Sequence, residues 1–242
     1  MAAASSFLRP RVQNVVATCT CGTALYLTGI ARTLRYAEYN PRRFSAVAVR
    51  LRTPRSTALV FSSGKIVCTG TKSAWAARWA LLKFVALLRD RCHVERAHVY
   101  TFRIQNMVAS VDAGFPVALA RLRRLYPREA SYEPALFPGL VYRAHATHGV
   151  VALVFASGRL VLTGAKHADE LDRAFETFWP ILYTAHARYG DGDGEPNDEP
   201  NNDDPTTTTT TTTTVETLLA SLANEGLLDV PATPLCGETE PF

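Results

Sequence analysis

Two matched sets of residues in this chain carry side chains that are suited to binding a partner. The first set contains Phe44 and Phe61, and the second contains Phe137 and Phe155. In each set the second Phe is followed by a Ser-Gly-basic turn and a Val-x-Thr-Gly strand, FSSGKIVCTG or FASGRLVLTG. Paired phenyl rings on an exposed surface can wedge between the base steps of a duplex and kink it. The chain shows no constellation of residues typical of a catalytic site.

Two asparagines accompany these sets, in the related motifs QNVVAT and QNMVAS. Side chains alternate between the two faces of a strand, so each asparagine shares a face with the residues two and four positions along. One sheet face therefore contains Asn14, Val16, Thr18, Leu59, Phe61, Val67, Thr69, Asn106, Val108, Ser110, Leu153, Phe155, Val161 and Thr163. The other face contains Ile66, Cys68, Leu160 and Leu162, which is the natural set for helices to cover.

A mixed apolar and amide surface of this kind matches the floor of a minor groove. At A·T pairs the floor presents only hydrogen-bond acceptors, whereas G·C pairs add the guanine amino donor. Small apolar side chains would leave that amino group desolvated and unpaired, which costs about 1–3 kcal/mol. An uncovered apolar sheet face is itself typical of a binding surface.

The elements that position these residues form an internal repeat between residues 12 and 189. Matching motifs recur at offsets of 92 to 94 residues, which is too long for a solenoid unit and indicates a duplicated domain. Helices are expected at 73–89 and 167–188, with Ser73 as an N-cap, and shorter helices at 23–36 and 116–126. Each half is then a sheet with helices on one face, so the fold class is α+β.

Charge divides the chain of 242 residues into a basic part and an acidic part. All 26 Lys and Arg precede residue 190 with 10 acids, so 26 − 10 gives +16, and the remaining 12 acids follow without a basic residue. A basic domain of this kind favours a polyanionic partner. No signal peptide or membrane span is expected, and the five scattered cysteines favour a reducing compartment.

The acidic part has two expected segments. Residues 190–214 form an acidic and Thr-rich linker that is too polar to pack, and residues 215–242 form an acidic amphipathic tail. Within the tail, Val215, Leu218, Leu219 and Leu222 fall on one helical face. The alternative is a disordered tail in which this pattern arises by chance.

Long motifs in both halves resemble the TATA-box-binding protein family. In chain order they are QNVVAT, AEYNPRRF, FSSGKIVCTGTKS, FRIQNMVAS, SYEPALFPGLVYR and FASGRLVLTGAK, and together they cover about residues 12–188. AEYNPRRF and SYEPALFPGLVYR are more similar to eukaryotic than to archaeal members. The resemblance implies a saddle in which two repeats, 12–101 and 102–189, follow a short arm, 1–11. They would form one curved antiparallel sheet with helices on its convex face.

The resemblance also implies a role for each site residue in binding TATA-like double-stranded DNA. DNA intercalation is implied for Phe44, Phe61, Phe137 and Phe155. Minor-groove base contacts are implied for Asn14, Val16, Leu59, Val67, Thr69, Asn106, Val108, Leu153, Val161 and Thr163. Phosphate contacts are implied for Arg43, Arg50, Arg55, Lys65, Arg143 and Arg159. Docking of a transcription factor IIB-like protein is implied for Glu133 and Leu136, and docking of a IIA-like protein or another regulator for Arg78, Lys83 and Arg89.

The sequence departs from the family pattern at the surface. The loop 143–155 is one residue longer than its counterpart and lacks the usual basic residues, and Ala135 replaces an acidic residue that helps to hold factor IIB. Apolar residues thin out the basic face of helix 73–89, and Trp75 and Trp79 could form a new apolar contact there. Docking of regulators on that helix is therefore in question.

The expected function is a general transcription initiation factor that binds and bends TATA-like DNA and recruits the RNA polymerase machinery. It would act in the nucleus, or in a viral replication compartment, without a cofactor or metal. His145 and His148 have no further ligand nearby and are interpreted as loop residues. The alternatives are a paralogue that holds or decoys initiation factors, and an enzyme that reuses the fold, for which no catalytic group is present.

The acidic tail adds an expectation of autoinhibition. A −12 segment tethered to a +16 domain should be attracted to the DNA-binding face. The linker 190–214 reaches roughly 25–30 Å, which would carry the leucine face of 215–222 under the sheet. Recruitment of an activator or a polymerase surface is the competing role for the tail.

Overall fold

The computed structural model describes residues 8–143 and 149–186. Contacts divide the chain into two compact units, 1–195 and 196–242, and every described residue belongs to the first. The loop histidines, the acidic linker and the amphipathic tail therefore lie outside the described residues. None of the described helices is both long and apolar enough to cross a membrane.

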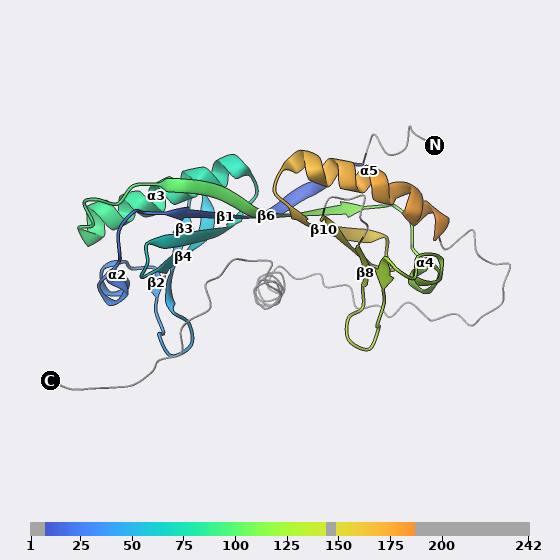
Figure 1. Cartoon of the computed structure of the whole chain (residues 1–242), viewed down its shortest axis with the longest axis horizontal. Helices are drawn as coiled ribbons and strands as arrows, with labels where there is room; N and C mark the ends of the chain where they lie inside the picture. Colours follow the sequence, from blue (N-terminus) through green and yellow to red (C-terminus); the bar gives the residue numbers. More distant parts are fainter. Residues whose placement is uncertain (1–7, 144–148, 187–242) are drawn as a thin grey trace. The chain divides into compact units, whose positions relative to one another are not determined.

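The described residues form one antiparallel sheet, and the helices lie on one face and at the two ends of this sheet (Figure 1). The strands are β1 (Arg11–Thr20), β2 (Ala37–Glu38), β3 (Ala46–Arg52), β4 (Arg55–Phe61), β5 (Lys65–Thr71), β6 (Tyr100–Asp112), β7 (Ala130–Ser131), β8 (Leu140–Arg143), β9 (Val151–Val154) and β10 (Arg159–Ala165). The helices are α2 (Leu27–Thr33), α3 (Ala74–Cys92), α4 (Leu119–Leu125) and α5 (Ala168–Thr184).

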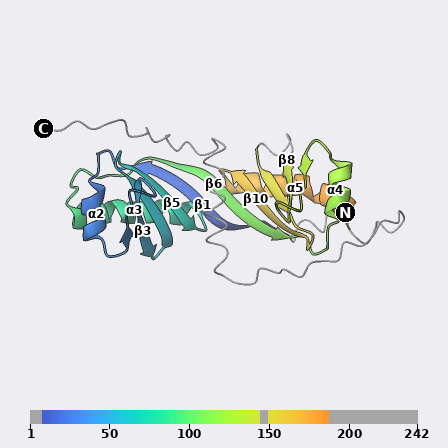
Figure 2. The ribbon, with the colours of Figure 1, turned by 90° about the horizontal axis from the view of Figure 1, so that it is seen from below.

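The order of the ten strands has the symmetry of a duplicated unit. From edge to edge it is β2-β3-β4-β5-β1-β6-β10-β9-β8-β7, so each half has the same connectivity when it is read from its own edge inward. The two long strands β1 and β6 pair in the middle, where Val15 lies opposite Met107. Seen from below, these two strands cross the centre of the sheet between the two halves (Figure 2). The expected α+β saddle of two repeats with one curved sheet is confirmed.

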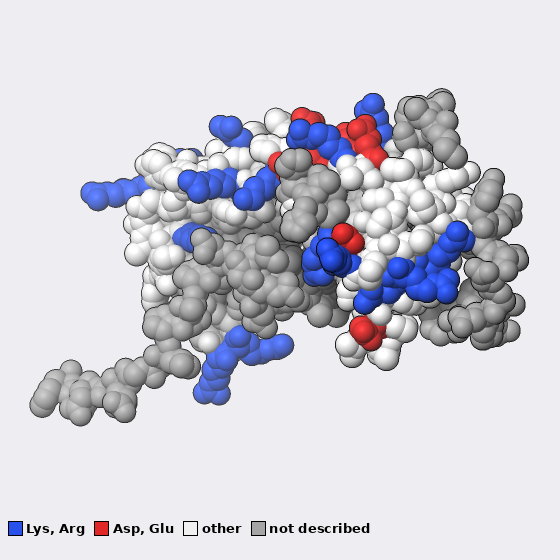
Figure 3. Space-filling model, turned by 45° about the vertical axis from the view of Figure 1, so that its right-hand side comes forward, with Lys and Arg blue, Asp and Glu red and all other residues white. Residues whose placement is uncertain are grey.

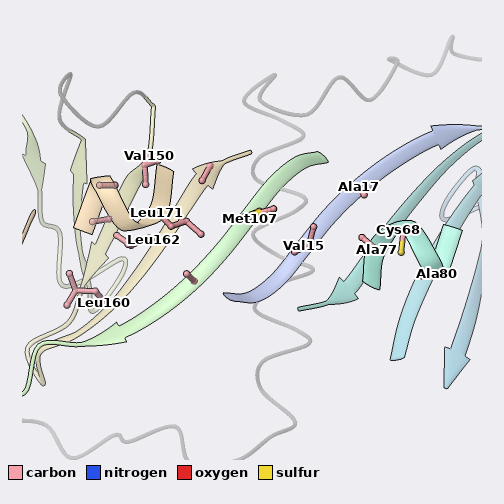
Figure 4. Close-up of a cluster of buried hydrophobic side chains, with 14 of the residues drawn as sticks. Val15, Ala17, Cys68, Ala77, Ala80, Met107, Val150, Leu160, Leu162 and Leu171 are labelled. Atoms are coloured by element: carbon pink, nitrogen blue, oxygen red, sulfur yellow. The ribbon is translucent and has the colours of Figure 1, made fainter. Parts of the chain in front are cut away.

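The core lies between the sheet and the long helices α3 and α5. Ile66, Cys68, Leu160 and Leu162 are fully buried, as the alternation predicts for the covered face. Figure 4 shows how side chains of α3 and α5, such as Ala77 and Leu171, approach the buried side chains of β5 and β10. Burial raises the pKa of the Cys68 thiol to about 12. This cysteine stays protonated at neutral pH and acts as a packing group.

The long helices begin where the sequence predicts. Ser73 caps α3, because its hydroxyl accepts a hydrogen bond from the backbone N–H of Ala76 at 3.1 Å. The helix then continues three residues beyond the predicted end, to Cys92. In α5 the predicted apolar face is confirmed, since Leu171, Phe175, Phe178 and Leu182 are all buried.

The short helices α2 and α4 are shorter than the predicted 23–36 and 116–126. The residues before each helix bond instead to the turn that precedes β5 in the first repeat and β10 in the second. Leu25 N–H donates to the carbonyl of Ser62, and Val117 N–H donates to the carbonyl of Ala156, at 2.8 and 2.9 Å. These backbone bonds hold the chain extended, and the helix starts only after them.

Candidate nucleic-acid interface

The face of the sheet opposite α3 and α5 is uncovered within the described part of the chain (Figure 1). Along β5, Lys65, Val67 and Thr69 are half-buried while their neighbours Ile66 and Cys68 are fully buried. Strand β10 repeats this alternation with its own valine and threonine. Both ends of the sheet turn away from the helices, so this uncovered face is the concave one (Figure 1).

The two predicted phenyl pairs form the same arrangement at both ends of the concave face. The rings of Phe44 and Phe61 have centroids 6.0 Å apart and an interplanar angle of 68°. The rings of Phe137 and Phe155 have centroids 5.9 Å apart and an angle of 65°. Edge-to-face packing fixes the rings of each pair relative to one another. Phe44 is 46% exposed although it is a large apolar residue, so part of its ring is available to a ligand.

The two asparagines are anchored at the centre of the same face. Asn14 Oδ1 accepts hydrogen bonds from Gly70 N–H at 2.7 Å and from Thr69 Oγ1 at 3.2 Å. Asn106 Oδ1 accepts from Gly164 N–H at 2.8 Å, and Asn106 Nδ2 donates to Thr163 Oγ1 at 3.1 Å. A backbone N–H can only donate, so each oxygen must face its glycine and each Nδ2 must lie on the far side of the amide.

The two glycines that anchor these amides have a backbone conformation that glycine adopts readily. Gly70 has a φ of +91° and Gly164 has a φ of +102°. The strand pairing shifts register beside them, between Val15 and Ala17 opposite β5 and between Leu162 and Ala165 opposite β6. A Cβ on Gly164 would lie 2.6 Å from the carbonyl oxygen of Gly149. These two bulges aim the glycine N–H groups at the asparagines.

The apolar residues predicted for the groove floor lie between the phenyl pairs. Val67 is opposite Leu59, and Val161 is opposite Leu153, so each pair shares one side of the sheet. Val108 is half-buried beside Asn14, its cross-strand neighbour. Val16 departs from the expectation of an open floor, because it is only 1% exposed. It lies opposite Asn106 at the centre of the concave face, whereas its repeat equivalent Val108 is half-buried.

The strand register also places the predicted phosphate-contacting residues on the concave side. Arg50 lies opposite Thr57, and Arg55 is two residues before Thr57, on the side of β4 that carries Leu59. Arg143 in the second repeat is two residues from Val141, which lies opposite Leu153. Lys65, Arg143 and Arg159 are thus on the same face as the predicted floor residues of their strands, and Arg43 is exposed next to Phe44.

The basic residues are not equivalent in their surroundings. Arg50 forms an exposed ion pair with Glu38 at 3.3 Å, so it must leave that carboxylate to contact a phosphate. Lysine and arginine appear in several separate groups on the face shown in Figure 3, whereas acidic side chains occupy a few small areas. This distribution agrees with the excess of positive charge in the first 189 residues.

Two glutamines form side-chain hydrogen bonds between the two repeats. No role was assigned to them from the sequence. Gln13 Nε2 donates to Ser110 Oγ at 2.8 Å, and Gln105 Nε2 donates to Thr18 Oγ1 at 2.7 Å. Each glutamine belongs to one central strand and bonds the other, so the two bonds are equivalents across the pseudo-twofold axis. The sequence marks both glutamines as repeated residues, because a glutamine precedes the asparagine in both repeat motifs, but it does not show which residues they bond.

The residues predicted to dock other factors lie on the outer surfaces. Glu133 is exposed and Leu136 is 87% exposed, in the loop that leads to Phe137. Lys83 donates to the carbonyl of Thr53 at 2.7 Å, and Arg89 contacts Asp90 at 3.3 Å. Arg78 is exposed on α3. The loop residues and the α3 residues thus belong to separate surfaces, and none of them is part of the concave face.

The fold and the site together define a class of protein. Its members are saddles of two repeats, and on the concave face of the sheet two asparagine amides lie between two pairs of phenyl rings. The family model described as "Transcription factor TFIID (or TATA-binding protein, TBP)" matches residues 9–91 and 101–185. The chain therefore belongs to the TATA-binding protein family.

Individual relatives agree with this family. The chain is 48% identical over 178 residues to the TATA-box-binding protein of Danio rerio, and 49% identical over 173 residues to the TATA box-binding protein-like 2 of Takifugu rubripes. These matches cover 74% and 72% of this chain but 58% and 53% of the relatives, so the chain matches little more than half of their length. The solved structure of Methanococcus jannaschii TBP covers 73% of this chain and 99% of its own, with a TM-score of 0.63 and 35% identity.

Proposed function

We propose that this protein binds TATA-like DNA through the minor groove, bends it and nucleates a transcription preinitiation complex. The observation that carries the proposal is the pair of matching phenyl wedges, 6.0 and 5.9 Å between centroids, at the two ends of one uncovered sheet face. Wedges inserted at two separated base steps bend a duplex and bring more of its groove onto the protein. Membership in the family and the basic charge of the domain both support this function.

The central residues of the concave face account for a preference for A·T pairs. With its oxygen held by Gly70 or Gly164, each asparagine offers an Nδ2 hydrogen as a donor toward the ligand, and in Asn106 this is the hydrogen that Thr163 Oγ1 does not accept. The floor of an A·T groove supplies acceptors for such donors. The valines and leucines beside them offer no acceptor, so a guanine amino group would lose its hydrogen bonds to water without replacement.

The partners follow from the exposed surfaces outside the groove. The loop with Glu133 and Leu136 is proposed to hold a factor IIB-like protein, and the basic residues Arg78, Lys83 and Arg89 of α3 to hold a IIA-like protein or another regulator. A complex of this kind recruits an RNA polymerase, which in a eukaryote places the protein in the nucleus. Catalysis has no part in the proposal, and burial raises the pKa of Cys19 to about 12, so that thiol is not a nucleophile.

The decisive experiment measures DNA bending by fluorescence transfer between dyes at the two ends of a TATA duplex. Phe155→Ala should weaken binding and reduce the transfer together, because one ring of a wedge is lost. Leu136→Ala is the matched control: this leucine is 87% exposed next to Phe137 but is not a wedge residue, so bending should be unchanged. Normal bending by Phe155→Ala would refute the wedge assignment.

A second candidate function is a paralogue that acts mainly by holding initiation factors. Two observations favour it: relatives named TATA box-binding protein-like 2 match as well as the others, and two tryptophans are exposed on α3. Selection of bound sites from random duplexes separates the two functions. Enrichment of A·T-rich sites supports the first function, and the absence of any preferred site supports the second.

A further inference from the structure

Helix α3 carries an apolar stripe on its solvent side that the proposed DNA interface does not use. Trp75, Trp79 and Leu82 are 74%, 45% and 44% exposed, and with Ala86 they follow helical spacing along one side. The two indole rings stack with centroids 6.1 Å apart and an interplanar angle of 8°. A contiguous exposed apolar surface of this kind is typical of a protein-binding site.

Positive charge borders this stripe along both edges. By the helical rotation of 100° per residue, Arg78 and Arg89 lie along one edge and Lys83 lies along the other. The ammonium of Lys83 is 5.7 Å from the ring centroid of Trp79, so it stays beside the stripe. The only acid within α3 is Asp90, and Arg89 contacts it at 3.3 Å.

A shallow, open pocket lies between the stripe and β3. It has a volume of about 270 Å³ and is lined by Leu51, Thr53, Lys83, Ala86, Leu87 and Asp90. An occupant that lies on the tryptophans could place an apolar side chain into this pocket. Tryptophan and arginine next to a pocket are the residue types that contribute most to binding energy at protein interfaces.

We propose that the α3 stripe binds the amphipathic segment 215–230 of the same chain. The apolar positions Val215, Leu218, Leu219 and Leu222 predict one leucine-rich helical face, which matches a stripe of indole rings. The segment carries Glu216, Glu225 and Asp229 and no basic residue, which matches the basic edges of α3. Both the apolar face and the charges of this segment are complementary to α3.

The length of chain between the last described helix and this segment permits the contact. Helix α5 ends at Thr184, and α3 and α5 lie on the same face of the sheet (Figure 1). The stretch 187–214 contains 28 residues. For any polypeptide of this length the end-to-end distance is roughly 30 Å as a random coil and about 90 Å when fully stretched. Helix α5 is only about 25 Å long, so the segment reaches α3 without strain.

The concave face is the competing place for the same segment, and the structure favours α3. On the concave face Phe44 is 46% exposed and most other apolar residues are half-buried within the sheet, whereas the α3 stripe brings together Trp75, Trp79 and Leu82 at 74%, 45% and 44% exposure. Covering the tryptophans therefore removes more apolar surface from water for each residue that is bound. This proposal does not depend on DNA binding, so it can fail or succeed independently of the proposed function.

The test follows the accessibility of the two tryptophans in the full chain. Trp179→Phe removes the third tryptophan, which packs against Phe115 and Phe175, and leaves Trp75 and Trp79 as reporters. In this background Leu218→Ser with Leu219→Ser should raise the acrylamide quenching constant by about twofold or more, because the indole rings become exposed to solvent. Leu235→Ser, a tail leucine outside the segment, is the matched control and should leave quenching unchanged.

Three outcomes would contradict the proposal. Equal quenching with and without the two leucines means that the segment does not cover the tryptophans. An increase in affinity for TATA DNA with unchanged quenching places the segment under the concave face instead. Protection that disappears on dilution assigns the contact to the tail of a second copy and not to the same chain.

Discussion

The two atoms of the Asn106 amide have different roles, one in the fold and one in the proposed binding of DNA. Its Oδ1 atom accepts from Gly164 N–H at 2.8 Å and holds the bulge of β10, while Nδ2 donates one hydrogen to Thr163 Oγ1 at 3.1 Å and has a second hydrogen for a ligand. An aspartate in this position would keep an oxygen for Gly164 but would present a second oxygen where the donor was. The two roles can therefore be tested apart.

We predict that Asn106→Asp keeps the fold but weakens binding to A·T-rich DNA by at least about tenfold, because a carboxylate would face the acceptors of the groove floor. Thermal unfolding should change little, and an equilibrium titration with labelled duplex measures the affinity. Asn106→Ala is the comparison: it leaves Gly164 N–H without its acceptor and should lower the free energy of unfolding by about 1–3 kcal/mol. Equal DNA affinity for the aspartate variant and the wild-type protein would rule out the proposed donor.

Gly139 lies against the second phenyl pair, which is the proposed wedge of the second repeat. A Cβ at this residue would lie 2.6 Å from Cε1 of Phe137 and 3.2 Å from Cε1 of Phe155. We predict that Gly139→Ala displaces the ring of Phe137 and reduces DNA bending, with a smaller effect than Phe155→Ala. Fluorescence transfer across a bound duplex measures the bend, and a thermal melt shows whether stability is retained. Unchanged bending would mean that the loop adapts without moving the wedge.

At the scale of elements, the start of α5 depends on one carboxylate. Glu170 is the third residue of the helix and accepts from the backbone N–H of Lys166 at 2.7 Å and of His167 at 3.3 Å. These backbone hydrogen bonds, that from Lys166 first, lower the pKa of Glu170 below its ordinary value of 4.5. A lowered pKa means that the stabilisation is complete above about pH 4.5 and is lost as the pH falls through the folded-state value.

We predict that Glu170→Ala lowers the free energy of unfolding by about 1 kcal/mol at pH 7, the usual value for a helix cap. The difference between variant and wild-type protein should shrink as the pH falls through the lowered pKa of Glu170, because the wild-type carboxylate then becomes protonated. Denaturant unfolding at pH 7 and at pH 3 measures both differences. A difference that is equal at the two pH values would show that the charge of Glu170 is not involved.

Elements with strong periodicity could be predicted from the sequence, and those set by long-range bonds could not. The start of α3 was predictable because Ser73 is a local N-cap signal. The helix itself was predictable because apolar residues such as Phe84 and Leu88 recur at helical spacing. The length of α2 was not, because the bond from Leu25 to Ser62 depends on a turn that lies far away in the sequence. Local periodicity therefore predicts where an element lies better than where it ends.

The candidate site shows the same division. Alternation in the strands was enough to group the asparagines, threonines and phenylalanines on one face. The glutamine bonds between β1 and β6 could not be predicted, because they depend on the register of two strands that pair across the repeats. The burial of Val16 could likewise not be predicted, because alternation assigns a residue to a face of the sheet but does not say how closely its neighbours pack around it.

At the scale of the molecule, the two repeats have matching phenyl pairs but different numbers of basic residues near them. The first repeat has Arg50, Arg52 and Arg55 on the paired ends of β3 and β4, where Arg52 lies opposite Arg55. The corresponding end of β8 in the second repeat has Arg143 opposite Val151. Phosphate attraction should therefore be stronger at the end of the duplex that is bound by the first repeat.

This difference is measurable as the dependence of DNA affinity on salt. Each phosphate contact that is lost should reduce the slope of log affinity against log salt by about one. Arg55→Ala should show that full reduction. Arg50→Ala should reduce the salt slope by less than one. Arg50 has to break its ion pair with Glu38, at 3.3 Å, in order to contact a phosphate, and the loss of that ion pair offsets part of the electrostatic gain from the phosphate.

The variant Glu38→Ala distinguishes this explanation from a difference in position alone. Once the carboxylate is removed, Arg50 no longer has to break an ion pair, so DNA affinity at low salt should rise modestly. In the Glu38→Ala background, Arg50→Ala should then reduce the salt slope as much as Arg55→Ala does. If its effect stays small in that background, Arg50 does not contact a phosphate, and the basic contribution of the first repeat has to come from Arg43, Arg55 and Lys65.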